Sequence, residues 1–370
     1  MKKAMRGVAW LVAVLVVIVA ALWFIPRPAG LWYQQELSAG YTGAFEKNGA
    51  LDSVTLLDLG GYSHPETVLV RDGWIYISVK DGVLLRMRED GSELTKLLDT
   101  GGCLLGFDFD AEAKLIVADC DYHGTGAVLR VTDDGSGSHE VLMSRETGME
   151  LYYPNGFAIG SDGTIYLTDS SSAFPPAKYD GSSSLAAANE GMMHSCTGRV
   201  IVRDPDTGEA SVLADGLAFA NGLALSADER SLYVCETYAY AVDRIDLETG
   251  ELHPFLTNLP GFPDNLTRGL DGRYWVGFNG ERSDALDAIS DKPFLRKCIW
   301  IYNKLSSANE SASIGYCHVF AFTEDGAVVE SLQSGANGYY RSTGAAETNE
   351  RLYLSSINGL GQLAYMDVSQ

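Results

Sequence analysis

The sequence predicts an all-β fold, a six-bladed β-propeller with an N-terminal transmembrane helix. Three observations predict it: short strands of alternating apolar residues between Asp-Gly and Thr-Gly turns, the recurrence of one two-strand unit along the chain, and an uncharged apolar stretch near the N-terminus. The 370 residues include 40 glycines and 11 prolines without a Gly-X-Y period, which favours many tight turns over collagen or long helices.

The recurring unit consists of a turn, a short strand, a polar break, a second strand and another turn. Alternating Val, Ile, Tyr, Leu and Trp is typical of strands, and the glycine of each turn supplies the positive φ that tight hairpins require. Units of about 40–75 residues are typical of propeller blades, whereas the repeats of a right-handed β-helix are far shorter. The units begin near Asp72, Ala113, Asp162, Glu229, Asp271 and Glu350.

Ring closure and domain boundaries follow from this reading. Residues 43–59 are expected to supply a strand that closes the last blade, because closure removes exposed sheet edges. We therefore expect an anchor at residues 1–27, a linker at 28–42 and the propeller at 43–370.

The N-terminal stretch from Val8 to Ile25 carries no charge and follows Lys2, Lys3 and Arg6. Eighteen apolar residues approach the length that spans the hydrocarbon of a bilayer, about 30 Å. Leu22 and its bulky neighbours occupy the place where a cleavage site needs small residues, so a retained signal anchor is favoured over a cleaved signal peptide. The preceding positive charges place the N-terminus in the cytoplasm and the propeller outside it, in the periplasm, the lumen or the extracellular space.

Composition excludes two classes of protein. A chain with 46% hydrophobic and 10% aromatic residues is not disordered, and a formal net charge of −22 excludes a binder of nucleic-acid phosphates, which requires clustered Lys and Arg. The sequence also lacks a GxSxG elbow and a P-loop, which argues against a serine hydrolase and against nucleotide chemistry.

If the propeller is exported, its six cysteines can form disulfides, because thiols can pair in an oxidising compartment. We expect a disulfide between Cys103 and Cys120, which flank one apolar stretch; the connectivity of the others stays open.

Two long insertions, 173–197 and 281–311, are candidate lids over a central pocket, although surface decoration is the alternative.

Oxygen-bearing side chains stand at the same offset in four repeats, just before a predicted innermost strand. If those strands run outward from one end of the propeller axis, the side chains converge there. Two carboxylates and three amide oxygens suit Ca²⁺ rather than zinc, which prefers His and Cys. Asn-Gly and Pro-Asp-Asn are also ordinary turn sequences, so the hypothesis depends on the joint pattern. The predicted calcium ligands are Glu66, Asn155, Asn221, Asp264 and Asn265.

Long strings of the sequence resemble a known family. The runs PNGFAIGSDGTIYLTDSSS, ANGLALSADERSLYVCETYAYAVDRID and NLPGFPDNLTRGLDGRYWVG are similar to the strictosidine synthase-like family, which includes the adipocyte plasma membrane-associated proteins, and more distantly to paraoxonases and gluconolactonases. The resemblance extends over about residues 60–367 and implies a propeller behind an N-terminal anchor. It also implies one central calcium held by the five residues given above.

The resemblance carries over less of the catalytic machinery. The stretch from Ser334 has no Glu at the place of the strictosidine synthase catalytic Glu, so that condensation is not expected. Leu105 stands where the paraoxonase pattern has a His. What remains is calcium-dependent hydrolysis of an ester or lactone, with Asp264 activating water and His123 as a second acid or base. A non-catalytic binding or scaffold propeller with a structural calcium is the alternative.

Overall fold

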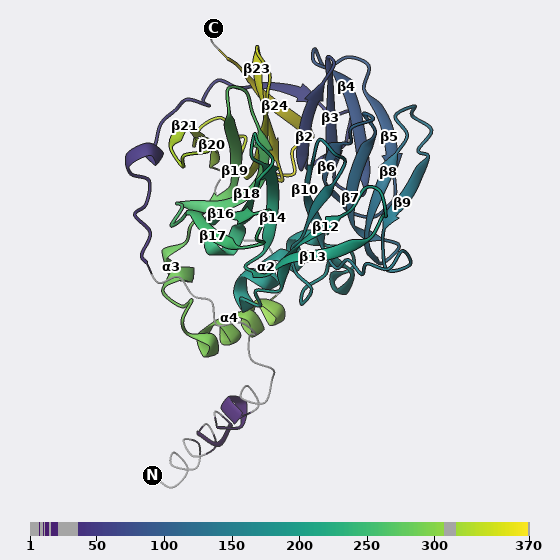
Figure 1. Cartoon of the computed structure of the whole chain (residues 1–370). Coiled ribbons are helices and arrows are strands. Elements are labelled where there is room, and N and C mark those ends of the chain that lie inside the picture. The colour runs from purple at the N-terminus through teal and green to yellow at the C-terminus, as the bar shows by residue number, and fades with distance from the viewer. Residues whose placement is uncertain are drawn as a thin grey trace.

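Six four-stranded antiparallel sheets follow one another around a central axis (Figure 1). This computed structural model describes residues 36–306 and 316–368, and before them only residues 7, 10, 12–14 and 16–20. The all-β, six-bladed propeller predicted from the sequence is confirmed. Each recurring unit of the sequence supplies the two middle strands of one blade, because those strands carry the strongest apolar alternation.

In every blade the innermost strand is followed in chain order by the strands further out. The outermost strand of the last blade is the exception, because it comes from the N-terminal side of the propeller. The first three blades contain β2 (Thr67–Arg71), β3 (Trp74–Val79), β4 (Val83–Arg88) and β5 (Thr95–Asp99); β6 (Leu104–Phe109), β7 (Leu115–Tyr122), β8 (Thr125–Val131) and β9 (His139–Met143); and β10 (Pro154–Ile159), β11 (Ile165–Asp169), β12 (Gly198–Arg203) and β13 (Ala210–Leu217).

The other three blades are built in the same way. They contain β14 (Ala220–Leu225), β15 (Ser231–Glu236), β16 (Ala241–Asp246) and β17 (Leu252–Leu256); β18 (Gly261–Arg268), β19 (Arg273–Glu281), β20 (Cys317–Thr323) and β21 (Val328–Ser334); and β22 (Ser342–Glu347), β23 (Arg351–Ser356), β24 (Gln362–Asp367) and β1 (Thr55–Asp58).

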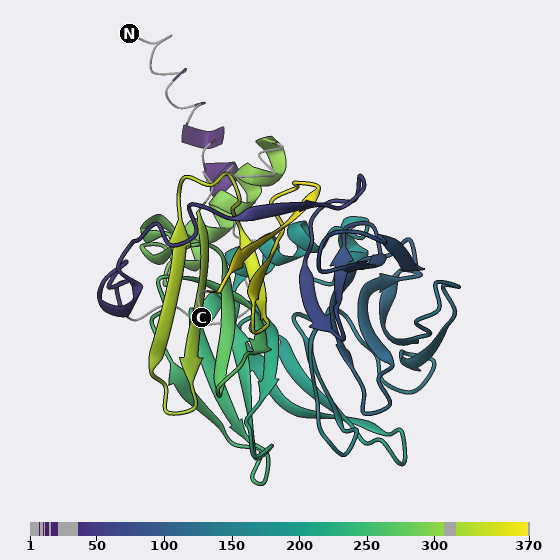
Figure 2. The same cartoon turned by 90° about the horizontal axis from the view of Figure 1, so that it is seen from above.

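The ring is closed by β1, which pairs with β24 in antiparallel register from Thr55 opposite Tyr365 to Asp58 opposite Gln362. Figure 2 shows the purple β1 alongside the yellow strands of the last blade. The predicted closing strand is therefore confirmed. Segments from the two ends of the propeller sequence therefore share one sheet. The edge of β24 is covered by β1 and is not exposed.

Apolar side chains fill the spaces between neighbouring blades. Tyr76 and Leu84 of the first blade, for example, pack in one buried cluster with Leu104 and Phe107 of the second. Because the faces of adjacent sheets are covered by each other, the middle strands are almost continuously apolar.

Four of the six innermost strands share one irregularity at the same position. In β6, β10, β14 and β18 the pairing register shifts by one residue, so that two residues of the inner strand lie opposite one residue of its partner. Such a β-bulge re-aims side chains locally. The bulged pairs are Leu105-Gly106, Asn155-Gly156, Asn221-Gly222 and Asp264-Asn265.

Glycine is required in these bulges because the inner strands approach each other closely there. A Cβ on Gly156 would lie 2.5 Å from the Asn221 carbonyl oxygen, and one on Gly222 would lie 2.1 Å from the Leu266 nitrogen. The Asn-Gly pairs, which look like turn sequences, thus lie inside strands and mark contacts between blades.

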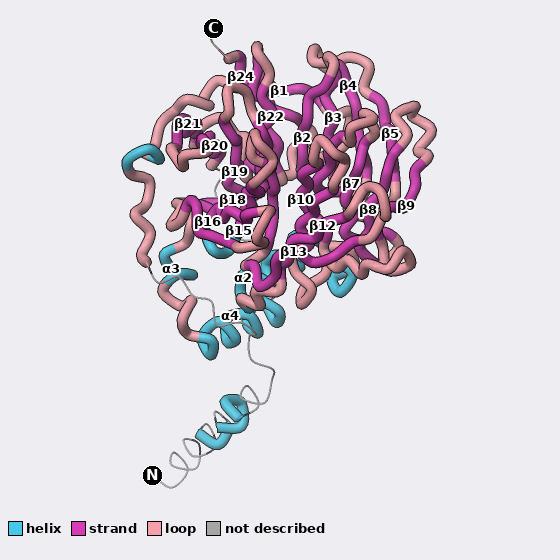
Figure 3. Tube along the Cα trace, viewed as in Figure 1, coloured by secondary structure: helices cyan, strands magenta, loops and turns pink. Residues whose placement is uncertain are grey.

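Both long insertions leave the propeller at the same end and carry helices. The first connects β11 to β12 and contains η2 (Pro176–Tyr179) and α2 (Ser183–Met193); the second connects β19 to β20 and contains α3 (Asp284–Asp287) and α4 (Pro293–Ser306). Figure 3 shows these helices, in cyan, gathered on one side of the strands. α2 and α4 pack together, with the Trp300 indole N–H donating to the Asn189 side chain.

The predicted membrane anchor lies mostly outside the described residues. Of the segment Val8–Ile25, only residues 10, 12–14 and 16–20 are described, and they are helical. Among the described residues, no helix is both long enough and apolar enough to cross a bilayer. The domain boundaries at residues 27 and 42 stay predictions.

Cys103 and Cys120 are free thiols in the structure, so the disulfide predicted between them is not formed there. The two residues nevertheless face each other at the start of β6 and the end of β7, where the Cys120 N–H donates to the Cys103 carbonyl at 2.9 Å.

Candidate functional site: a ring of oxygen ligands at one end of the channel

The first residue of each bulge belongs to a ring of buried side chains around the propeller axis. Asn155, Asn221 and Asp264 occupy this place in three blades, and Leu105 occupies it in a fourth. Glu66 stands directly before β2. The four polar members are between 2% and 8% exposed. The bulges bring together side chains that lie far apart in the sequence.

Both carboxylate oxygens of Asp264 accept hydrogen bonds. Its Oδ1 accepts a hydrogen bond from Asn221 Nδ2 at 2.6 Å, and its Oδ2 accepts one from Asn279 Nδ2 at 2.8 Å. Burial raises the pKa of Asp264 to about 6, although the two amide hydrogen bonds and the charge of Arg341 act in the opposite direction. The carboxylate is thus fixed in orientation and is a stronger base than an exposed Asp.

Glu66 carries the second negative charge of the ring. Burial raises its pKa well above the usual range, and the negative charge of Asp264 raises it further. Two buried carboxylates repel each other when both are ionised. A cation bound between them would offset this repulsion and stabilise the site.

The ring also contains acceptor oxygens without donors. Oδ1 of Asn155 and Oδ1 of Asn221 are fully buried and accept no hydrogen bond from the described residues. Their amide nitrogens are occupied, because Asn155 Nδ2 donates to Ser170 Oγ at 3.1 Å and Asn221 Nδ2 donates to Thr237 Oγ1 and to Asp264. Each carboxamide is therefore oriented with its unpartnered oxygen available. An unpaired buried acceptor is costly unless a ligand completes it.

These residues fit a calcium ion. Two carboxylates and two unpartnered amide oxygens are the hard ligands that Ca²⁺ prefers. In the described part of the chain no three His, Cys, Asp or Glu side chains cluster as a metal site, so a zinc-type centre has no counterpart there.

Asn265, the fifth predicted ligand, lies differently. It is the second residue of its bulge, equivalent to Gly156 and Gly222, and its Nδ2 donates to the Glu66 carbonyl at 2.8 Å and to Thr67 Oγ1 at 3.3 Å. Its side chain also lines a cavity of about 220 Å³ beyond the ring. Asn265 thus contacts Glu66 of the ring as well as this cavity, and its role as a ligand stays a prediction.

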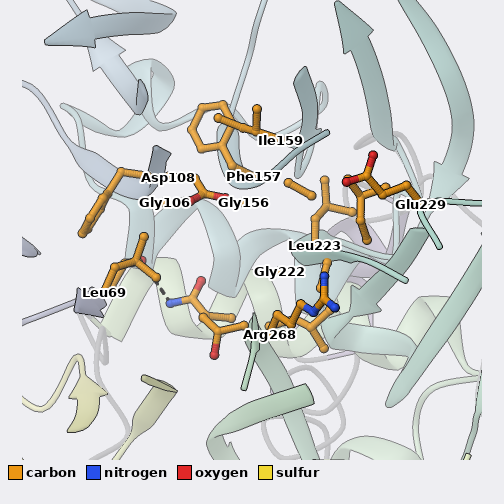
Figure 4. A pocket seen from close by; sticks show the side chains of 18 residues that line it. Leu69, Gly106, Asp108, Gly156, Phe157, Ile159, Gly222, Leu223, Glu229 and Arg268 are labelled. Atoms are coloured by element: carbon orange, nitrogen blue, oxygen red, sulfur yellow. Dashed lines mark hydrogen bonds between the residues drawn. The ribbon is translucent and has the colours of Figure 1, made fainter. Parts of the chain in front are cut away.

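The cavity follows the inner strands away from the ring towards the opposite end of the channel. Figure 4 shows Leu69, Phe157 and Leu223 among its apolar lining residues, with Glu229 and Arg268 also lining it. Asp108 is a polar exception, and burial raises its pKa to about 6. The ring and the cavity are two distinct environments in one channel.

His123, the predicted second acid or base, lies at the tip of the β7–β8 hairpin. Its side chain is exposed and its ring lies against that of Tyr122, with centroids 4.2 Å apart. Its backbone φ of 51° is the left-handed value that a tight hairpin requires. The described contacts of His123 do not bring it to the ring.

Sequence reasoning missed three neighbours of the ring. Asn279 on β19 bonds Asp264, and Tyr238, whose hydroxyl donates to the Ala187 carbonyl of α2 at 2.5 Å, joins the ring to the first insertion. Arg341, directly before β22, interacts electrostatically with Asp264 and Glu66. Only Arg341 had a sequence signal, since it stands before an inner strand as Glu66 does.

Comparison with known proteins supports the family assignment. The sequence model of the strictosidine synthase family matches residues 155–247. The sequence model of the N-terminal part of strictosidine synthase-like proteins matches residues 43–87. The chain is 30% identical over 356 residues to the adipocyte plasma membrane-associated protein of Salmo salar, covering 89% of this chain and 81% of that protein.

It is also 30% identical over 253 residues to protein STRICTOSIDINE SYNTHASE-LIKE 6 of Arabidopsis thaliana, covering 67% of this chain and 65% of the relative. The matches to this protein and to STRICTOSIDINE SYNTHASE-LIKE 4 span less than two thirds of the plant proteins' length.

Solved structures with the same fold include a gluconolactonase of Xanthomonas campestris and a calcium-binding protein, regucalcin, of Agrobacterium tumefaciens. The first is 20% identical with a TM-score of 0.59, covering 94% of this chain and 99% of that one. The second is 12% identical with a TM-score of 0.57, covering 85% and 93%. At these identities the similarity shows the propeller fold alone.

Proposed function

We propose that this chain, which belongs to the strictosidine synthase-like family, is a calcium-dependent hydrolase of small esters or lactones. The observation that carries the proposal is the ring itself: a buried, oriented carboxylate with a raised pKa stands beside unpartnered amide oxygens. Gluconolactonase among the proteins that share the fold adds support for lactones as a substrate class.

Glu66, Asn155, Asn221 and Asp264 would hold the calcium ion. Bound there, Ca²⁺ would polarise the substrate carbonyl and stabilise the negative charge that develops on its oxygen. Asn279 and Asn221 keep the Asp264 carboxylate in place from both sides.

Asp264 would act as the general base. It accepts a proton from a water molecule while the water oxygen forms a bond to the carbonyl carbon, and the bond from that carbon to the ester oxygen then breaks. The proton returns from Asp264 to the departing alkoxide, so that the acid and the alcohol are released and the carboxylate is regenerated.

Location and partners belong to the same proposal. The uncharged stretch from Val8 to Ile25 would tether the propeller to a membrane with the ring on the extracytoplasmic side. The fish relative is named as a plasma membrane-associated protein, which supports association with a membrane. The substrate would be a small molecule rather than a nucleic acid.

A second function is favoured by one observation. The polar ring residues are at most 8% exposed, and Tyr238 connects their neighbourhood to α2. A calcium ion enclosed in this way could serve only to stiffen a binding propeller.

The test separates the two functions. Full-length protein is assayed on 4-nitrophenyl esters and on aliphatic and sugar lactones, with calcium and with EDTA. The hydrolase proposal expects turnover that EDTA abolishes, that calcium restores, and that Asp264→Ala reduces at least 100-fold. Calcium binding without turnover of any substrate would favour the binding propeller.

A further inference from the structure

Arg341 occupies a constrained position at the ring end of the channel. It directly precedes β22, as Glu66 directly precedes β2, and it has a left-handed backbone with a φ of 56°. This conformation is unfavourable for a side chain such as Arg, so the surroundings must enforce it. The Arg341 N–H donates to the Tyr316 carbonyl at 3.3 Å, and the Arg341 carbonyl accepts from the Ile357 N–H at 3.1 Å.

Arg341 stands close to the ring without a partner among the described residues. Thr343, two residues further on, donates its hydroxyl to the Glu66 carbonyl at 2.6 Å, and the charge of Arg341 acts on Glu66, Asp264 and Tyr238, which belong to three different blades. Within the described residues the Arg341 guanidinium forms no ion pair and no side-chain hydrogen bond. Its side chain is only partly buried.

Two other arginines at this end of the molecule form ion pairs. Arg199 contacts the Asp169 carboxylate at 2.7 Å, and Arg282 contacts Asp287 at 2.6 Å. Five N–H donors in a rigid fork make an arginine suited to a planar anion such as a carboxylate. Arg341 is therefore a positively charged group whose hydrogen-bonding capacity is unused.

The charges of the site indicate what the free guanidinium would bind. Glu66 and Asp264 contribute −2, a calcium ion would contribute +2, and Arg341 contributes +1, which leaves +1 in total. The tyrosines and asparagines around the ring are neutral. A ligand with one negative charge would balance the site.

We propose that Arg341 binds a carboxylate of the substrate, so that the preferred substrates are esters or lactones that carry a carboxylate near the scissile carbonyl. This inference rests on the proposed function, because it specifies the substrate class of the same site. Arg341 would recognise and orient the substrate, and Asp264 would act on the carbonyl.

The kinetic test uses two esters that share a leaving group. 4-Nitrophenyl hemisuccinate carries a carboxylate on its acyl chain, and 4-nitrophenyl butyrate does not. With calcium present, Arg341→Gln is expected to lower kcat/KM at least 10-fold for the hemisuccinate, mainly through KM, and less than threefold for the butyrate. Arg341→Lys keeps the charge without the planar fork and should lose an intermediate amount.

Arg268 supplies the matched control, because it lines the cavity at the other end of the same channel and is exposed. Arg268→Gln should leave both kcat/KM values within twofold of the unaltered protein. Equal losses on the two esters in Arg341→Gln, or the same preference lost in Arg268→Gln, would overturn the proposal.

A binding measurement makes the inference independent of turnover. Succinate is titrated calorimetrically into calcium-loaded protein at fixed free calcium, and thermal melting confirms that each variant is folded. Binding by the unaltered protein and at least 10-fold weaker binding by Arg341→Gln is the expected result; equal binding, or no binding by either, contradicts it. If succinate binding depends on Arg341 while no ester is hydrolysed, the hydrolase proposal fails and the carboxylate site stands.

Discussion

Two sets of buried carboxylates in this propeller differ in what surrounds them. Asp119 lies within β7 and Asp169 ends β11, the second strands of their blades, and both accept backbone N–H groups of the loop that enters the same blade: Asp119 accepts from Cys103, and Asp169 accepts from Tyr152 and Tyr153. Arg199 also contacts Asp169 at 2.7 Å. Among the described residues, Asp264 accepts hydrogen bonds only from side-chain amides. Its negative charge disfavours a negative charge on Glu66.

The difference shows that burial of a carboxylate does not by itself mark a functional site. Asp169 is fully satisfied by backbone N–H groups and Arg199 and carries out a structural task, whereas Asp119 accepts backbone N–H groups with Oδ1 and keeps Oδ2 without a donor among the described residues. The carboxylates of the ring are arranged beside acceptor oxygens that no described donor satisfies. A ligand, rather than the fold, would complete the second set.

The largest effect is expected where a structural carboxylate is removed. Asp169→Ala leaves the Arg199 guanidinium and two backbone N–H groups without their partner, which should lower the free energy of unfolding by about 3 kcal/mol. Chemical denaturation measures this loss. The calcium-induced rise in Tm should persist in this variant, and its disappearance would mean that the two sets are not separate.

The next effect concerns the bulges that build the ring. Gly222→Ala places a Cβ 2.1 Å from the Leu266 nitrogen, so the neighbouring inner strands must move apart at a cost of about 2–3 kcal/mol. Gly280→Ala is the control, because its Cβ would lie 3.5 Å from Phe262 in ordinary contact. Equal denaturation midpoints for the two variants would show that the blades do not need the close approach.

A smaller effect of opposite sign is expected for a ring carboxylate. Glu66→Gln removes a carboxyl group whose ionisation is opposed by burial and by the charge of Asp264, so the calcium-free variant should be more stable than the unaltered protein by about 1 kcal/mol. Its affinity for calcium should fall at least 10-fold in a calorimetric titration. Destabilisation of the calcium-free protein would place Glu66 among the structural carboxylates.

Asp108 in the cavity tests the effect of burial alone. Its folded-state pKa of about 6 lies above the value of about 3.9 for an unfolded chain, so folding binds a proton between these pH values. Its contribution to stability is therefore present at low pH and is lost as the pH rises from about 4 to 6, by about 3 kcal/mol at most. Asp108→Asn should remove this slope when denaturation curves are compared across pH; an unchanged slope would contradict the burial argument.

The sequence predicts the propeller well because its signals are local. Alternating strands between glycine turns define the middle strands of each blade, and residues 43–59 contain the closing strand β1. The common offset of Asn155, Asn221 and Asp264 likewise reflects one structural cause, the bulge.

What the sequence could not show depends on contacts between distant segments. Asn279 reaches Asp264 only through the pairing of β18 with β19, and Tyr238 meets α2 across two blades. Asn265 follows Asp264 directly, yet as the second residue of the bulge it contacts both Glu66 and the cavity. The prediction of a Cys103–Cys120 disulfide gave the neighbouring strands correctly but not the bond.

The central claim is that the ring binds calcium, and thermal unfolding of the full-length protein with and without calcium tests it most directly. At 100 times its dissociation constant, calcium should add about 2.7 kcal/mol to the free energy of unfolding and raise Tm. Asp264→Ala should abolish the increase, while Asp169→Ala, although less stable, should keep it. An unaltered protein whose Tm does not respond to calcium, or an Asp264→Ala variant that responds fully, would contradict the account.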